Sequence, residues 1–135
     1  MSLGLCILAG GLLAARLEVT DFTLEWRHSI EKILWREAWR VEDAGLRLTR
    51  AEVRGSGAGM DPPAGAQPTA DGWTYVPDLP LQPRLNLARS GLVEDYRLCL
   101  RGQCRPLGAL AGDLPADQGV VLTPCDGDFS PRPPR

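Results

Sequence analysis

The chain concentrates its chemistry-bearing side chains in one short stretch. Its only histidine, His28, follows Trp26, and Trp35, Glu37 and Trp39 come soon after it. A carboxylate beside an imidazole fixes the imidazole tautomer and favours its protonated form. An arrangement of this kind serves acid–base chemistry, ligand binding or a structural polar pair.

Apolar and polar residues alternate over 22–28 and 35–41, which predicts two half-buried strands. If the strands form an antiparallel hairpin, we expect facing position numbers to sum to 65, which pairs Leu24 with Val41, Trp26 with Trp39, and His28 with Glu37. The same register places Glu25 opposite Arg40. Sums of 63 and 67 place like charges opposite each other, which is unfavourable.

Three interpretations of the His28–Glu37 pair remain open: a structural pair that holds the register, a ligand-contacting pair, or part of a metal site. One histidine with carboxylates such as Glu31 and Glu37 falls short of a usual transition-metal set, so we predict no metal site. Ser29 adjoins His28, and neighbours in a strand point to opposite faces, so a serine–histidine nucleophile is disfavoured.

A glycine-rich segment, Gly55-Ser56-Gly57-Ala58-Gly59-Met60, precedes Pro62-Pro63 and predicts a loop with unusual backbone angles. It resembles a phosphate cradle in composition. It lacks the Lys-Ser/Thr ending and a following helix, so we predict no nucleotide and no other cofactor. The alternatives are a tight turn or backbone amides that line an anion site beside His28.

The candidate ligand- or partner-binding residues are therefore Trp26, His28, Ser29, Glu31, Trp35, Glu37, Trp39, Gly55, Ser56, Gly57, Gly59 and Met60. No catalytic residue is assigned.

Two of the four cysteines, Cys99 and Cys104, flank a turn signal at Arg101-Gly102. They can face each other across a hairpin and form a disulfide in an oxidising compartment. The alternative is that Cys125 bridges to Cys99 or Cys104 and pins the C-terminal segment. The spacing fits a zinc site poorly.

An uncharged run over residues 3–15 is too short for a bilayer span, and it predicts that residues 1–15 form a signal-peptide-like leader or a weak membrane anchor. Through residues 3–15 the protein could contact a membrane. Ala14-Ala15 offers a cleavage point before Arg16. The alternative is a core strand or helix, which Gly10-Gly11 disfavours. We expect a periplasmic or membrane-tethered domain.

Beyond the first hairpin, the sequence predicts a third strand over 46–53 with a bulge near Thr49-Arg50, because the apolar alternation changes phase there. Short strands are also predicted over 73–76, 85–88, 96–100, 104–107 and 120–122. Such short, regularly spaced strands favour an all-β fold, a small antiparallel β-sandwich or barrel. We expect one domain over 16–130 and a disordered tail over 131–135.

The composition excludes some classes of function. The chain has 135 residues and a formal net charge of −2, so it has no broad basic surface of the kind that binds nucleic acid. Its hydrophobic content of 44 % permits one modest core.

The blocks that begin at Phe22 and at Gly55, together with the Cys99–Cys104 segment, resemble the domain of unknown function 1850 family over roughly residues 22–107. The family consists of small bacterial proteins, often encoded beside genes of tripartite ATP-independent periplasmic (TRAP) transporters. The resemblance implies a transporter permease or substrate-binding protein as partner, and it implies no established activity.

Two functions follow as hypotheses. The first is an exported accessory or binding protein that binds a TRAP transporter component or its carboxylate substrate. The alternative is a small hydrolase-like enzyme that uses His28 with Glu31 or Glu37.

Overall fold

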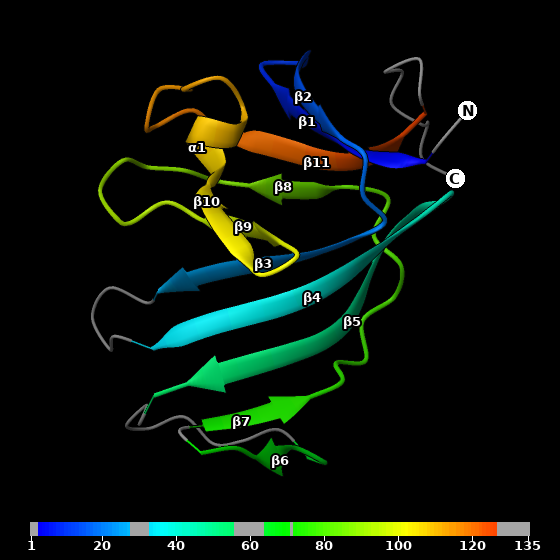
Figure 1. Cartoon of the computed structure of the whole chain (residues 1–135), viewed down its shortest axis with the longest axis vertical. Coiled ribbons are helices and arrows are strands. Elements are labelled where there is room, and N and C mark those ends of the chain that lie inside the picture. Colours follow the sequence, from blue (N-terminus) through cyan, green and yellow to red (C-terminus); the bar gives the residue numbers. More distant parts are fainter. Residues whose placement is uncertain (1–2, 28–32, 56–63, 71, 127–135) are drawn as a thin grey trace.

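The computed structural model describes residues 3–27, 33–55, 64–70 and 72–126, which form two antiparallel sheets packed face to face (Figure 1). The four-stranded sheet has the order β2 (Leu12–Leu17), β1 (Gly4–Ala9), β11 (Val120–Cys125), β8 (Leu85–Leu87). The seven-stranded sheet has the order β10 (Gln103–Pro106), β9 (Arg97–Leu100), β3 (Asp21–Arg27), β4 (Leu34–Glu42), β5 (Gly45–Arg54), β7 (Gly72–Tyr75), β6 (Gln67–Pro68). The predicted all-β sandwich is confirmed, and the sheets do not close into a barrel.

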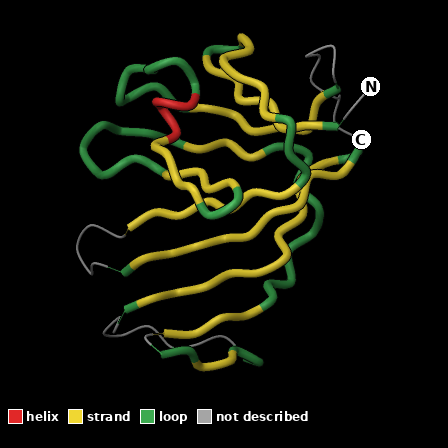
Figure 2. Tube along the Cα trace, viewed as in Figure 1, coloured by secondary structure: helices red, strands yellow, loops and turns green. Residues whose placement is uncertain are grey.

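Helix is confined to one short turn, α1 (Leu107–Leu110), within the described residues (Figure 2). The sequence did not predict α1, and residue 107 was expected to end a strand. None of the described helical residues forms a segment long and apolar enough to cross a membrane.

The core lies between the two sheets, because alternate residues of each central strand point inward. Phe22, Leu24 and Trp39 of the larger sheet are buried together with Leu5 and Leu122 of the smaller one. The two sheets are thus held together by a single continuous core between them.

The predicted register between β3 and β4 is wrong. The position numbers of facing residues sum to 61, so Trp26 faces Trp35, Glu25 faces Arg36, and Leu24 faces Glu37. This register also places opposite charges across from each other, and it lets Trp26 stack on Trp35 rather than face Trp39. Glu37 therefore lies opposite a core leucine, and its predicted partner His28 lies outside the described residues.

The predicted bulge in β5 is confirmed. Ala38 faces Arg50 and Trp39 faces Leu48, so Thr49 is the extra residue. Its hydroxyl donates a hydrogen bond to the Ala38 carbonyl at 3.0 Å. The bulge restores the inward orientation of the apolar residues on both sides of it.

The structure does not show the predicted leader. The uncharged run instead forms the hairpin β1–β2, with positive φ angles at Gly10 and Gly11 in its turn. Strand β1 lies between β2 and β11, and Leu5, Cys6 and Ile7 are all fully buried. A strand buried on both faces is uncharged for the same reason as a leader, because no side chain reaches water. The four-stranded sheet begins within this run, so the sandwich includes residues N-terminal to the predicted domain start at residue 16.

Two disulfides join the four cysteines. The predicted Cys99–Cys104 bridge is confirmed, and it links facing residues of β9 and β10. The second bridge joins Cys6 to Cys125 with a Cα–Cα distance of 5.8 Å. Cys125 thus pins the C-terminal strand to β1, a pairing outside the predicted alternatives because Cys6 was assigned to the leader.

Candidate functional site

One end of the larger sheet combines strand ends with long connections. Arg27, Leu34, Arg54 and Gly72 lie next to one another across β3, β4, β5 and β7. The loops 88–96 and 111–119 reach the same end beside α1 (Figure 2). Loops held by a rigid sheet are the usual place for binding residues.

A cavity of about 620 Å³ opens there, and we call it the Trp26 cavity. It is lined by Trp26 and Arg27 at the end of β3, by most of the segment 88–96, and by residues of α1 and the turn after it. Its size is that of a pocket for one small organic molecule.

An aromatic wall bounds the cavity. The Trp26 indole stacks on Trp35 with ring centroids 6.3 Å apart and planes within 5°. Tyr96 meets Trp26 edge-on at 5.6 Å. Because Trp35 and Tyr96 hold the Trp26 ring from two sides, the indole is a preorganised surface for an apolar or ring-shaped group.

Another part of the lining is built on Arg89, whose side chain is only 5 % exposed. Arg89 forms a two-point ion pair with Asp95 at 2.9 and 3.0 Å, and it also donates hydrogen bonds to the carbonyls of Pro115 and Gln118. Asp95 accepts a further hydrogen bond from the Gly108 amide. Any side chain at Gly108 would collide with the Arg89 guanidinium. This network ties the segment 88–96 to α1 and the following turn, so it fixes the shape of the cavity.

The charges that line the cavity are not balanced. Arg27 and Arg89 supply two positive charges, whereas Glu94, Asp95 and Asp113 supply three negative ones. Arg89 and Asp95 neutralise each other. The cavity therefore disfavours a bound anion.

Glu37 lies two residues beyond Trp35 along the same face of β4. Burial raises the pKa of Glu37, and a hydrogen bond from the Trp39 indole N–H at 3.3 Å partly offsets this rise. Burial also raises the pKa values of Tyr75 and Tyr96, and the Glu37 charge adds to both shifts. Glu37 is thus a half-buried carboxylate among aromatic rings behind the Trp26 cavity.

The structure brings together only part of the predicted site. Trp26 lines the cavity, Trp35 supports it, and Glu37 lies behind it. Trp39 is a core residue, 4 % exposed. Gly55 follows β5 with a φ of 125°, as the predicted unusual backbone requires. The remaining candidates lie outside the described residues: His28, Ser29, Glu31, Ser56, Gly57, Gly59 and Met60.

Sequence reasoning missed most of the cavity. Tyr96, Arg89 and Asp95 carry no local pattern, since the Arg89–Asp95 pair spans a loop and its hydrogen bonds reach residues over 20 positions away. The sequence signal that could have indicated the cavity is the pair of opposite charges, Arg89 and Asp95, in the predicted connection between the strands over 85–88 and 96–100.

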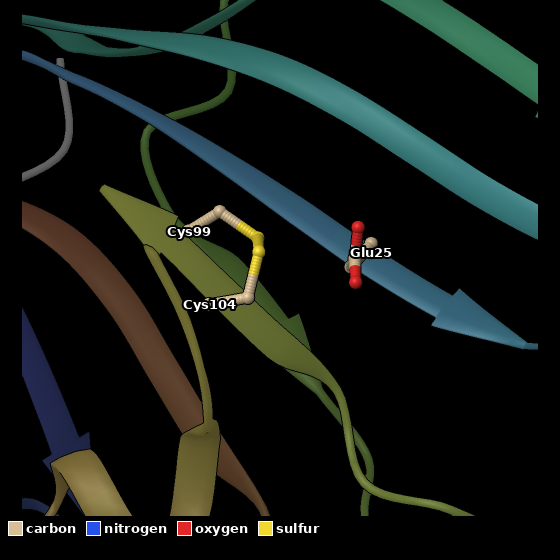
Figure 3. Close-up of side chains that lie close together, drawn as sticks. All are labelled: Glu25, Cys99 and Cys104. Carbon is tan, nitrogen blue, oxygen red and sulfur yellow. A yellow bond between two sulfur atoms is a disulfide. The ribbon is translucent and has the colours of Figure 1, made fainter. Parts of the chain in front are cut away.

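A second cluster, Glu25 with Cys99 and Cys104, has the composition of a metal site, and it is the one such group among the described residues (Figure 3). Both sulfur atoms belong to a disulfide and so offer no thiolate. The Glu25 carboxylate pairs with Arg36 at 3.1 Å and with Arg97 at 2.8 Å. The oxidised cluster is therefore a structural ion-pair group and does not fit a cation.

The sequence profile of a family described as a domain of unknown function, DUF1850, matches residues 22–107. The chain therefore belongs to this family. The match covers β3 to β10 and includes Trp26, Arg89 and Tyr96 of the cavity. No curated protein and no solved structure matches the chain.

Proposed function

We propose that this protein is an exported accessory protein that binds a small ligand in the Trp26 cavity. The observation that carries the proposal is the cavity itself, which has a preorganised aromatic wall and a buried polar frame. Arg89 and Asp95 neutralise each other through their ion pair, so these buried charges need no ligand as a partner. The cavity beside them is left free for a ligand.

The lining favours a ligand with an apolar ring or chain and a neutral or positively charged group. The Trp26 and Tyr96 rings attract an apolar or cationic group through dispersion and their negative faces. Glu94 and Asp113 supply carboxylates on the loops around the same cavity. This charge pattern argues against the carboxylate substrate that the sequence suggested.

Three probes with one ring and different charges test this proposal: phenethylamine, phenethyl alcohol and phenylacetate. Isothermal titration should rank the affinities in that order, with the cation tightest. Trp26→Ala should abolish binding of all three probes because it removes the stacking surface. Glu94→Gln with Asp113→Asn should bring the phenethylamine affinity down to that of the alcohol.

Trp39→Phe is the matched control, because Trp39 is a core residue that does not line the cavity. It should leave the affinities unchanged. Tightest binding by phenylacetate, or unaltered binding by Trp26→Ala, would contradict the proposal.

Export is supported by the two disulfides, which fit an oxidising compartment. We propose that the exported protein keeps β1, because Cys6 forms a fully buried bridge to Cys125. Mass spectrometry of the protein from the oxidising compartment should find Cys6 retained and bonded. A mature chain that begins at Arg16 would refute retention.

For the partner, we propose a TRAP-type transporter component, a permease or its substrate-binding protein, which is what the family resemblance implies. Tagged protein should co-purify with that component from membranes, and its absence from the purified material would contradict the association. His28, on which the hydrolase-like alternative depends, lies outside the described residues, so that alternative stays a prediction.

A further inference from the structure

The outer face of the seven-stranded sheet is rich in arginine. Residues directly opposite in an antiparallel pair share a face, so the register assigns seven arginines to this surface. They are Arg27, which also borders the Trp26 cavity at the strand end, and Arg36, Arg40, Arg47, Arg50, Arg54 and Arg97. The same face carries four carboxylates, those of Asp21, Glu25, Glu42 and Glu52.

The charge of this face is opposite in sign to the net charge of the whole chain. It has an excess of three positive charges, whereas the whole chain has a formal net charge of −2. Such a separation creates a positive potential over one side and steers an acidic partner to it.

Carboxylates hold several of the arginines in place. Arg36 and Arg97 share Glu25, and Arg54 pairs with Glu52. Their side chains are still 32 %, 47 % and 43 % exposed, so each guanidinium keeps donors that face solvent. Because these arginine side chains are already ordered before a partner binds, the entropy cost of binding is lower.

A depression of about 190 Å³ lies at the centre of the face. It is lined by Thr23, Arg36, Ala38, Arg50 and Glu52. The Glu52 carboxylate is neutralised by its ion pair with Arg54. Arg50 is exposed and uses its Nε to donate to the Thr74 hydroxyl at 2.7 Å, so its two terminal nitrogens are not needed for this hydrogen bond and can donate to another acceptor. The depression has room for a single carboxylate group between two guanidinium groups.

We propose that this arginine face binds an acidic segment of a partner protein, with one carboxylate seated over Ala38. The alternation of positive and negative groups fits a protein of complementary pattern, since each charge on the face specifies a position in the partner. An anionic bilayer would repel the four carboxylates.

The apolar residues on the surface also argue for a protein partner. Among the described residues, the large apolar side chains that are exposed lie outside the strands of the seven-stranded sheet: Leu12, Leu13, Val76, Leu79, Leu92 and Val93. Peripheral binding to a bilayer usually adds apolar insertion to charge. Single-stranded nucleic acid would need aromatic rings to stack on, and the register turns Trp26, Trp35 and Trp39 to the inner face.

The probe is an extended peptide of alternating Glu and Thr, with the Gln–Thr peptide as its neutral counterpart. Titration by NMR of the intact, oxidised protein should give binding of the acidic peptide only. Shifts should centre on Ala38 and Arg50, and about 0.5 M NaCl should abolish them.

Arg40→Gln with Arg50→Gln should weaken the affinity roughly tenfold, because two contacting charges are removed while the Glu25 pairs stay intact. Arg84→Gln with Arg105→Gln makes the same change in net charge at exposed positions off the face, and should alter the affinity less than twofold. Equal effects of the two double variants would overturn the proposal. So would the absence of peptide binding, or arginine-dependent binding to phosphatidylglycerol vesicles in its place. The cavity probes bind at a different surface, so failure here is distinguishable from failure of the proposed function.

Discussion

Strand β3 has two halves with different surroundings. Phe22 and Leu24 are 3 % and 1 % exposed beneath the smaller sheet. Trp26, two residues further on the same face, is half-buried and lines a cavity. The same inner face therefore packs into the core where the second sheet covers it, and it offers a binding surface where loops replace that sheet.

The largest effect should come from the bridge that closes the covered half. Cys6→Ala with Cys125→Ala removes a disulfide with a sequence separation of 119, and should lower the free energy of unfolding by about 4 to 5 kcal/mol. Cys99→Ala with Cys104→Ala removes one with a separation of 5 and should cost about 2 kcal/mol. Urea unfolding measures both. A larger loss from the second pair would contradict the expectation that the bridge closing the longer loop stabilises the fold more.

Alanine substitutions along β3 sharpen the comparison. Leu24→Ala should destabilise the fold by about 3 kcal/mol, because it leaves a void in the core, and should leave probe affinity unchanged. Trp26→Ala should cost about 1 to 2 kcal/mol, since its ring is already partly in water, and should abolish probe binding. Thermal melts and titrations on the same samples separate the effects. Affinity losses that follow the melting temperatures of both variants would show that Trp26 acts only through stability.

The smallest effect concerns Glu37, between the two halves. Its folded-state pKa is raised by burial, so the protonated form is favoured and stability falls as pH rises through the unfolded-state pKa toward the folded one. Glu37→Gln should remove this fall and stabilise the protein at neutral pH, while its amide oxygen still accepts from the Trp39 indole. Urea unfolding from about pH 4 to 7 checks this.

The pKa of Glu42 is shifted in the opposite direction, so Glu42 serves as the control. Arg47 donates a hydrogen bond to its carboxylate and holds its pKa low, so its stabilising contribution is present above the unfolded-state pKa and is lost as pH falls through the folded one. Glu42→Gln should therefore not remove the loss of stability that Glu37 causes at rising pH. If it does, the account of Glu37 is wrong.

Local sequence patterns predicted the strands and turns better than they predicted how neighbouring strands pair. The phase change at Thr49 identified the bulge, and the turn signal at Arg101-Gly102 identified the Cys99–Cys104 hairpin. The β3–β4 register was not decided by charge, because sums of 61 and 65 both give Glu25 an arginine. Strands outside the hairpin also help to determine the β3–β4 register, as the ion pair between Arg97 of β9 and Glu25 of β3 illustrates.

The rest of the site depends on contacts distant in sequence. The segment 88–96 lies beside Trp26 because β9, which follows it in the chain, pairs with β3. An uncharged run such as residues 3–15 is equally typical of a leader and of a doubly buried strand, and only its pairing with β11 distinguishes the two.

The most direct test of the binding site uses the four tryptophans as reporters, since each gives one indole N–H resonance in a ¹H–¹⁵N spectrum. Titration with phenethylamine should shift the Trp26 resonance saturably, shift its stacking partner Trp35 less, and leave Trp39 unmoved. A shift of Trp39 as large as that of Trp26, or saturable binding with no shift at Trp26, would contradict the claim that the open half of the sheet is the ligand site.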